Sequence, residues 1–178
     1  VHERFPDLRV LRNDRNLGFA RANNQGLSIS KGRYFLLLNS DTIVPSGGID
    51  ELVRFADRTP EIGVLGPKLL NMDGTLQESW SSFPSLWSEL IGQTPRDRQP
   101  LKDFPFAYEV DWISGACMLV RAKTIEAVGL FDEDYFMYSE ETDWCYRMKT
   151  KGWKIMYLSN AEIFHLGGGS ADRASLTQ

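Results

Sequence analysis

The chain has 178 residues and a formal net charge of -4, with 42% hydrophobic and 25% charged residues. These values predict one globular domain with a core of its own. The negative charge gives no reason to expect nucleic acid or an anionic membrane as a partner.

The apolar runs are too short to cross a bilayer, and no signal peptide opens the chain. Cys117 and Cys145 do not form a metal-ligand spacing, and two cysteines do not make a disulfide framework. We therefore interpret both as reduced core residues of a cytoplasmic protein.

The first half of the chain alternates strand and helix patterns. We expect a strand at 8–12, a helix at 17–30, a strand at 33–39 buried on both faces, a helix at 49–58, and two strands around a turn within 62–79.

The second half begins with an aromatic and proline-rich stretch at 80–108, which includes Trp80, Phe83 and Trp87 and a short helix pattern at 85–92. Such a stretch is either a lid or a packed surface excursion. After it we expect a strand at 110–121, a helix at 122–129 closed by Gly129, a helix at 140–151, strands at 153–158 and 163–170, and a tail at 171–178. This alternation predicts an α/β architecture.

The apolar run at 34–38 leads directly into Asn39, Ser40 and Asp41. These residue types form local turns, which is one interpretation. The other is a site at the end of a strand, where oxygen ligands hold Mg²⁺ or Mn²⁺ together with phosphate oxygens and water. The triplet alone does not decide between them.

Glu141 occupies an unusual place in the helix at 140–151. Ser139 is a candidate N-cap, and Asp143 and Arg147 have the spacing of a surface ion pair. At 100° per residue, Glu141 falls in the apolar arc of the same helix, where a charge is costly without a partner or a task. A partly buried carboxylate with an adjusted pKa suits a general base.

His165 ends an apolar strand just before the glycines at 167–169. It is a candidate metal or phosphate contact, and the glycines would let backbone amides approach an anion. A structural role for His165 is an equal alternative.

Five segments stand in this order along the chain: NLGFARANNQG, LLLNSDT, WISGACMLVRA, GLFDEDYFMYSEETDWCYR and IFHLGGGS. Together they resemble inverting glycosyltransferases of family 2, which have a GT-A-type nucleotide-diphospho-sugar transferase fold. Their sequences are most similar to the rhamnosyltransferase-like branch. The resemblance implies a mixed sheet flanked by helices. It also implies a metal-dependent transfer of sugar from a nucleotide-diphospho-sugar, such as dTDP-rhamnose or a UDP-sugar, to a saccharide or lipid-linked acceptor in cell-envelope polysaccharide synthesis.

The same resemblance assigns roles to individual residues. Glu141 would be the catalytic base, and Asp41 and His165 would hold a divalent metal, Mg²⁺ or Mn²⁺. The donor-binding set would be Arg21, Asn24, Asn39, Asp41 and Gly115. The acceptor-binding set would be Trp112, Glu140 and Asp143, with Ser114 near the reacting sugar.

The resemblance also implies that an amino-terminal strand-helix-strand is missing, so that residues 1–170 form a partial catalytic domain. An exposed sheet edge would then favour a homodimer. The location would be cytoplasmic, or peripheral at the inner face of the membrane.

Three rival hypotheses belong to other classes. A non-catalytic nucleotide-sugar or metal-binding fragment is the first. A glycoside hydrolase fits poorly, because Glu140 and Glu141 are adjacent on a helix and point about 100° apart. A Rossmann dehydrogenase is remote, because no G-x-G-x-x-G follows a strand.

Overall fold

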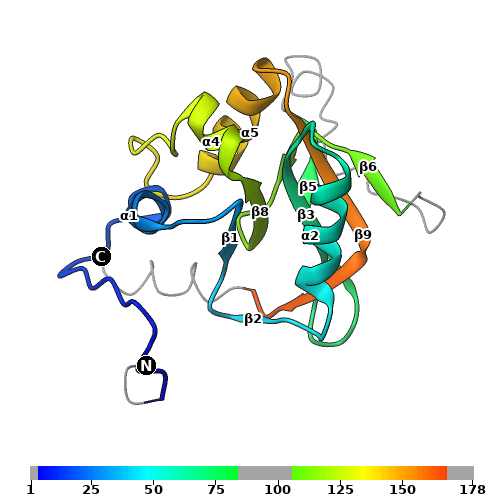
Figure 1. Ribbon diagram of the computed structural model, residues 1–178. Coiled ribbons are helices and arrows are strands. Elements are labelled where there is room, and N and C mark those ends of the chain that lie inside the picture. Colours follow the sequence, from blue (N-terminus) through cyan, green and yellow to red (C-terminus); the bar gives the residue numbers. More distant parts are fainter. Residues whose placement is uncertain (1–3, 84–105, 168–178) are drawn as a thin grey trace, which may run out of the picture.

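A mixed seven-stranded sheet runs through the centre of the computed structural model (Figure 1). The structure describes residues 4–83 and 106–167. The main path of the sheet is β1 (Tyr34–Leu38), β8 (Cys117–Arg121), β3 (Ile62–Leu70), β9 (Lys154–His165) and β2 (Thr42–Ile43). Two short strands extend it, β4 (Leu76–Gln77) on β3 and β6 (Ala107–Glu109) on β9, while β5 (Trp80–Ser81) pairs with β7 (Trp112–Ile113) in a separate ribbon.

The central strands are β3 and β9. Every residue of β3 except Lys68 is buried, as expected for a strand that is covered on both faces. It runs parallel to β9 and antiparallel to β8, which makes the sheet mixed as expected.

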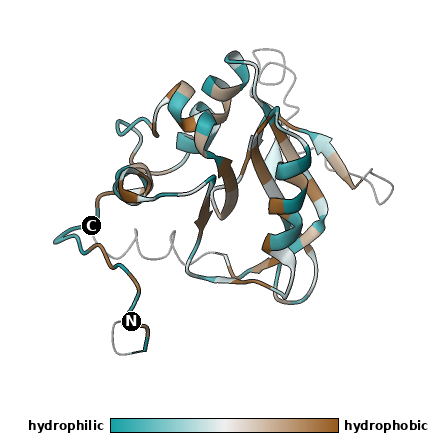
Figure 2. Ribbon diagram, in the orientation of Figure 1, coloured by the Kyte–Doolittle hydropathy of each residue, from teal (hydrophilic) through white to brown (hydrophobic). Residues whose placement is uncertain are grey.

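Helices cover both faces of this sheet. On one face α2 (Gly48–Arg58) buries Leu52 and Ala56 against a cluster that includes Leu65. On the other face α1 (Phe19–Ile29), α4 (Ala122–Val128) and α5 (Glu140–Thr150) pack against a cluster that includes Val64. Neighbouring residues of β3 thus point to opposite faces, and Figure 2 shows brown strands between helices whose outer surfaces are largely teal.

The four expected helices that fall within the described residues are confirmed, with boundaries within two residues of those predicted. Gly129 ends α4 with a φ of 79°, which a glycine adopts without strain. Ser139 is the N-cap residue of α5 as predicted, although its side chain makes no capping hydrogen bond there. No helix within the described residues is long and apolar enough to cross a membrane.

Three strand predictions need correction. Residues 8–12 do not form a strand; Leu8 and Leu11 are exposed, and no described strand takes up their backbone groups. The expected strand at 110–121 is broken into β7 and β8, because the chain turns at 114–116 and the two halves join different sheets. The two strands expected after 152 are one continuous strand, β9, with an irregular register opposite Pro67 and Lys68.

Two further predictions also differ from the structure. β1 is not buried on both faces: it ends the sheet path, pairs only with β8 among the described strands, and leaves Leu38 40% exposed. The ends of the aromatic stretch belong to β5 and β6 rather than to an excursion. Trp87, the helix expected at 85–92 and the tail at 171–178 lie outside the described residues.

Candidate active site

Strand pairing brings the polar triplet after β1 next to His165. β2 pairs antiparallel with the end of β9, so that Thr42 faces His165 and Asp41 precedes that pair. The backbone repeats the contact, because Leu166 N donates to Asp41 O at 2.9 Å. Asn39 N donates to Ala116 O at 3.0 Å, which connects the triplet to the turn between β7 and β8.

The side chains of this group converge on the Nε2 side of the His165 ring. His165 Nε2 lies 3.3 Å from Asp41 Oδ1 and 3.3 Å from Asn39 Nδ2. On the other side of the ring, Nδ1 lies 2.6 Å from Gln77 Oε1. The chain does turn at Ser40 and Asp41, and Thr42 Oγ1 donates to Asn39 O at 2.8 Å across this turn.

The first turn of α5 carries one buried and one partly buried acidic side chain. Glu140 is 3% exposed, Glu141 is partly buried, and in each the Oε2 atom is buried without a hydrogen-bond partner. Burial raises the pKa of both carboxyls, and for Glu141 the backbone N–H groups of Glu141 and Gly115 offset part of that rise. The place of Glu141 in the apolar arc is confirmed, because Trp144, Cys145 and Met148 of that arc are buried.

The backbone just before α5 is strained. Tyr138 and Ser139 both have left-handed backbones, with φ of 71° and 73°. Each costs about 1–2 kcal/mol for a residue other than glycine. Such strain is retained where it serves the placement of groups, and here it starts α5 at the point where its two carboxyls reach the pocket.

One pocket of about 240 Å³ collects these groups. Its lining residues come from α1, the turns after β1 and β7, the approach to α5 and the end of β9. They are Phe19, Asn39, Asp41, Ser114, Gly115, Ala116, Met137, Tyr138, Glu140, Glu141 and His165. The structure therefore brings together seven of the residues named from the sequence, among them Asp41, Glu141 and His165.

Four other predicted site residues do not line this pocket. Arg21 forms an ion pair with Glu133, and Asp143 forms the expected pair with Arg147 at 2.8 Å. Trp112 donates its indole N–H to the backbone oxygen of Ser82.

Asn24 is buried and has a clear structural task. Its amide donates to Phe131 O at 2.9 Å and to Glu133 Oε1 at 3.1 Å, and its Oδ1 accepts from Phe131 N at 3.0 Å. These bonds fasten α1 to the segment after α4. The donor-binding prediction for Asn24 is therefore not supported by its position.

The residues present fit a divalent cation that is shared with a ligand. Two protein atoms bound side by side to one cation at about 2.1 Å would lie roughly 3 Å apart, and Asp41 Oδ1 and His165 Nε2 are 3.3 Å apart. Within residues 4–83 and 106–167 no three His, Cys, Asp or Glu side chains group into a metal site. The protein would thus supply few ligands, and phosphate oxygens and water would fill the rest.

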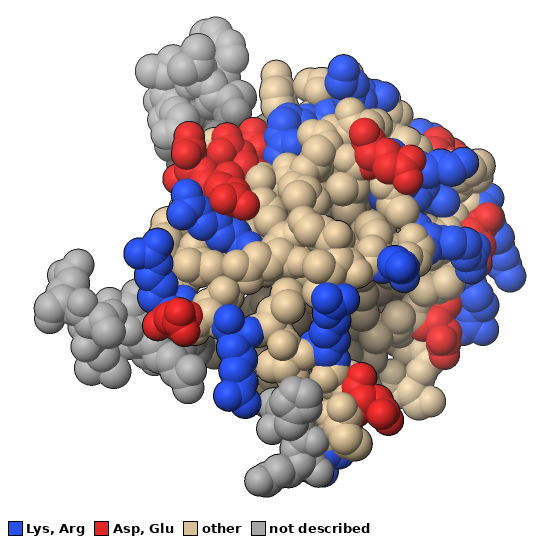
Figure 3. Space-filling view, turned by 60° about the vertical axis from the view of Figure 1, so that its left-hand side comes forward, with Lys and Arg blue, Asp and Glu red and all other residues tan. Residues whose placement is uncertain are grey.

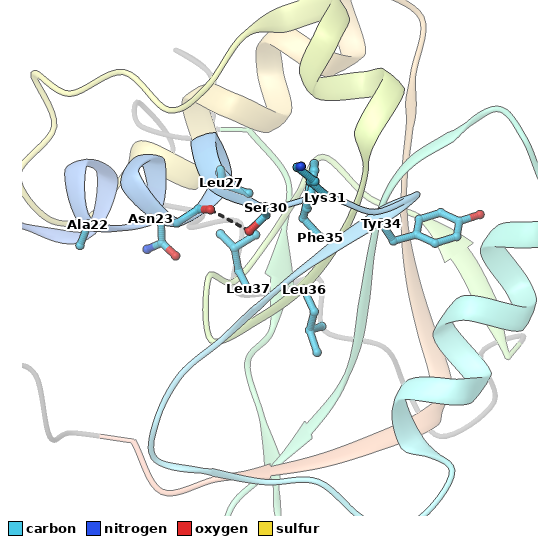
Figure 4. Close-up of a pocket in the computed structure, with 10 residues that line it drawn as sticks. Ala22, Asn23, Leu27, Ser30, Lys31, Tyr34, Phe35, Leu36 and Leu37 are labelled. Carbon is cyan, nitrogen blue, oxygen red and sulfur yellow. Dashed lines mark hydrogen bonds between the residues drawn. The ribbon is translucent and has the colours of Figure 1, made fainter. Parts of the chain in front are cut away.

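A second hollow of about 360 Å³ lies between α1 and β1 (Figure 4). It is lined by Asn23, Lys31 and aliphatic side chains such as Leu36, and Ser30 Oγ donates its proton to Gly26 O. No residue predicted for the site lines it. On the face shown in Figure 3, basic and acidic side chains are interspersed around an uncharged area, so charge alone does not mark a binding surface there.

Four lining residues were not identified from the sequence: Phe19, Ala116, Met137 and Tyr138. Met137 and Tyr138 directly precede the acidic start of α5 and could have been named by that adjacency. Gln77 was missed as well. No local signal marks it, because its contact with His165 joins positions 88 apart in the chain.

Comparison with known proteins gives a consistent result. The family described as Glycosyl transferase family 2 matches residues 1–129. An N-acetylglucosaminyl-diphospho-decaprenol L-rhamnosyltransferase of Mycobacterium tuberculosis (strain CDC 1551 / Oshkosh) is 31% identical over 96% of this chain and 62% of its own length. A low-salt glycan biosynthesis hexosyltransferase of Haloferax volcanii is 26% identical over 89% of this chain and 52% of its own length. The chain thus spans about half to two thirds of these relatives.

Solved glycosyltransferase structures share the fold. GalNAc-T7 with UDP, GalNAc and Mn²⁺ superposes with a TM-score of 0.66 at 15% identity, covering 88% of this chain and 31% of that one. The mannosyltransferase PcManGT of Pyrobaculum calidifontis with GDP-Man and Mn²⁺ superposes with a TM-score of 0.61 at 14% identity, covering 98% of this chain and 44% of that one. The expected GT-A-type fold is confirmed.

Proposed function

The chain belongs to glycosyl transferase family 2, and we propose that it carries the catalytic centre of a metal-dependent, inverting glycosyltransferase. The observation that carries this proposal is the single pocket lined by Asp41, Glu141 and His165. These residues come from the turn after β1, from α5 and from β9, which are far apart in the sequence, and their side chains are of the types that the reaction needs.

In this proposal Glu141 is the general base. It would remove the proton from the acceptor hydroxyl, which then attacks the anomeric carbon of the donor sugar as the bond to the nucleoside diphosphate breaks. Its raised pKa brings the carboxyl closer to the operating range of a base, because burial disfavours its charged form. A single displacement of this kind inverts the anomeric configuration and needs no covalent intermediate.

Asp41 and His165 would hold Mg²⁺ or Mn²⁺ against the diphosphate of the donor. When bound, the cation would neutralise the charge that develops on the leaving group. Support comes from the 3.3 Å separation of the two side chains and from the Mn²⁺ present in the two solved relatives. Asn39 and Gly115, in the same pocket, would contact the donor.

The donor is a nucleotide-diphospho-sugar, and dTDP-rhamnose is the first candidate because the mycobacterial relative is an L-rhamnosyltransferase. That relative's name also motivates a lipid-linked saccharide acceptor in cell-envelope polysaccharide synthesis, handled at the cytoplasmic face of a membrane. Glu140, which lines the pocket beside the base, would contact the acceptor. Residues 1–170 would form the catalytic domain.

The competing function is a non-catalytic nucleotide-sugar or metal-binding fragment. The partial coverage of the relatives favours keeping it as an alternative. The deciding experiment screens labelled nucleotide sugars against this chain, with and without Mn²⁺, and records both binding and turnover. Turnover would support the catalytic proposal, whereas binding without turnover would favour the non-catalytic alternative.

A matched variant tests the metal part of the proposal. We expect Asp41→Asn to weaken Mn²⁺ binding at least tenfold, because an amide oxygen carries no charge to offset that of the cation. Asp14→Asn, at an exposed carboxylate outside the pocket, is the control and should bind Mn²⁺ like the wild type. Unchanged Mn²⁺ affinity in Asp41→Asn, measured by electron paramagnetic resonance, would remove Asp41 from the metal site.

A further inference from the structure

A chain of hydrogen bonds runs from the turn between β3 and β4 to the ring of His165. Thr75 Oγ1 donates to Asp73 Oδ1 at 2.6 Å, and Asn71 Nδ2 donates to Thr75 Oγ1 at 2.9 Å. Gln77 Nε2 donates to Asn71 Oδ1 at 3.0 Å, and Gln77 Oε1 lies 2.6 Å from His165 Nδ1. Each residue contacts the next, so the orientation of one fixes that of its neighbour.

Which group donates and which accepts at each step of this hydrogen-bond chain is determined at the Asp73 end. The O–H and N–H of Thr75 hold the pKa of the Asp73 carboxyl below its usual range, so at neutral pH this group only accepts hydrogen bonds. Thr75 has one hydroxyl proton and gives it to Asp73; its oxygen must therefore accept from the Asn71 amide.

The donors and acceptors of the remaining hydrogen bonds, as far as the histidine, follow from this first assignment. Asn71 has turned its NH₂ toward Thr75, so its oxygen faces Gln77 and accepts from the Gln77 NH₂. The oxygen of Gln77 is then left facing His165 Nδ1. A short contact to an amide oxygen requires a proton on the nitrogen, so Nδ1 is the protonated atom.

The opposite side of the ring agrees with this assignment. With the proton on Nδ1, neutral His165 has a lone pair on Nε2, which can accept from Asn39 Nδ2 at 3.3 Å. The same lone pair lies 3.3 Å from the carboxylate oxygen of Asp41. Two electron-rich atoms at this distance repel each other unless a positive charge lies between them.

We propose that Gln77 is a positioning residue, and that the relay Asp73–Thr75–Asn71–Gln77 fixes His165 as the Nδ1–H tautomer with its Nε2 lone pair aimed at the cation. The cation itself rests on the proposed function, whereas the tautomer does not. Hydrogen bonds from the second ring nitrogen commonly fix histidine ligands in this way, and losing them costs about 10–100-fold in metal affinity. The partner of His165 Nδ1 comes from β4, at a position 88 residues away in the sequence.

The tautomer can be measured directly in the metal-free chain. The sequence has two histidines, so ¹⁵N-labelled imidazole resonances are assigned with a His2→Gln variant and recorded at about pH 8, where an unperturbed imidazole is neutral. We expect the proton on Nδ1 and a bare Nε2. A ring protonated at Nε2 alone, or at both nitrogens, would overturn the proposal.

Two substitutions at Gln77 separate positioning from packing. Gln77→Met keeps the length of the side chain but removes the acceptor, so we expect mixed tautomers. Gln77→Glu keeps an oxygen that accepts from Nδ1 and should retain the wild-type tautomer. A single Nδ1–H tautomer in folded Gln77→Met would contradict the relay, as would a switch to Nε2–H in Gln77→Glu.

A titration with Mn²⁺ alone links the relay to the metal. Mn²⁺ affinity should fall about 10–100-fold in Gln77→Met and much less in Gln77→Glu. If the wild type shows the Nδ1–H tautomer but binds no Mn²⁺, the metal part of the proposed function fails while the relay stands. If Gln77→Met loses the tautomer and keeps full Mn²⁺ affinity, the positioning role is refuted.

Discussion

Replacing Glu141 with Gln should slow transfer and stabilise the fold at the same time. The carboxyl is the proposed base, so its loss should lower kcat/KM by the roughly 10²–10⁴-fold that a positioned base contributes. At about 1.36 kcal/mol for each factor of ten, this is about 2.7–5.4 kcal/mol of transition-state stabilisation. Donor binding should change little, because Asp41 and His165 remain.

The stability effect follows from the burial of the charge. Burial raises the pKa of Glu141 above its ordinary value of 4.5, so folding disfavours the ionised form. The resulting loss in the free energy of unfolding is absent below about pH 4.5. It grows as the pH rises from the unfolded-state pKa to the folded-state pKa of Glu141, and it is constant above the folded-state pKa. At pH 8, each pKa unit between the unfolded-state and folded-state values lowers the free energy of unfolding of the wild type by about 1.4 kcal/mol.

Glutamine is neutral and avoids this penalty. It can also keep an oxygen as acceptor for the Gly115 N–H, while its NH₂ replaces an Oε2 that is already without a partner. We therefore expect a higher Tm at pH 8, by about 2–4 °C for each kcal/mol in a domain of this size. The gain should vanish near pH 4.

Thermal unfolding of the chain between pH 4 and pH 8 measures the stability effect, and a transfer assay measures the catalytic one. Glu126→Gln, at an exposed residue of α4, is the control for the loss of one charge and should show neither effect. Full turnover by Glu141→Gln would reject it as the base. A Tm at pH 8 no higher than that of the wild type would refute the argument from burial.

Three more predictions concern the scaffold. Gly115→Ala should lower the free energy of unfolding by about 1–3 kcal/mol, because the added Cβ would lie 2.7 Å from the Phe19 ring. Gly26→Ala is the control: its added Cβ meets no atom within 4 Å, so the substitution should be neutral or stabilising. Urea unfolding measures both. Arg147→Lys should lower the Tm, because a lysine cannot reproduce the bonds to Asp143 and to two backbone carbonyls; a Tm equal to that of the wild type would show those bonds to be dispensable. Among the described strands β1 pairs on one side only, and this edge predicts self-association of the chain; sedimentation as a monomer at about 100 μM would contradict it.

Local sequence is enough to place the helices and to single out the unusual carboxylate. Helix positions follow from apolar spacing within four residues and from local stop signals, and these signals located the four helices to within two residues. The place of Glu141 in an apolar arc is likewise a property of helix geometry alone, so the order of residues in α5 suffices to identify it.

Whether a segment with a strand pattern forms a strand depended on contacts with distant parts of the chain. Residues 8–12 have a strand pattern but no described neighbour, and the run at 110–121 was divided because its two halves pair with different strands. A strand is completed by partners that are distant in the chain, and the local pattern does not contain them.

The site shows the same division. Asp41 and His165 could be identified as candidates from their residue types, but they become neighbours only through the pairing of β2 with β9. The family resemblance also suggested Asn24 for the donor site, whereas in the fold its side-chain amide bonds to the backbone of Phe131 and holds α1 in place. Gln77 carried no signal at all, because its contact with His165 exists only once β4 and β9 flank β3 in the folded sheet.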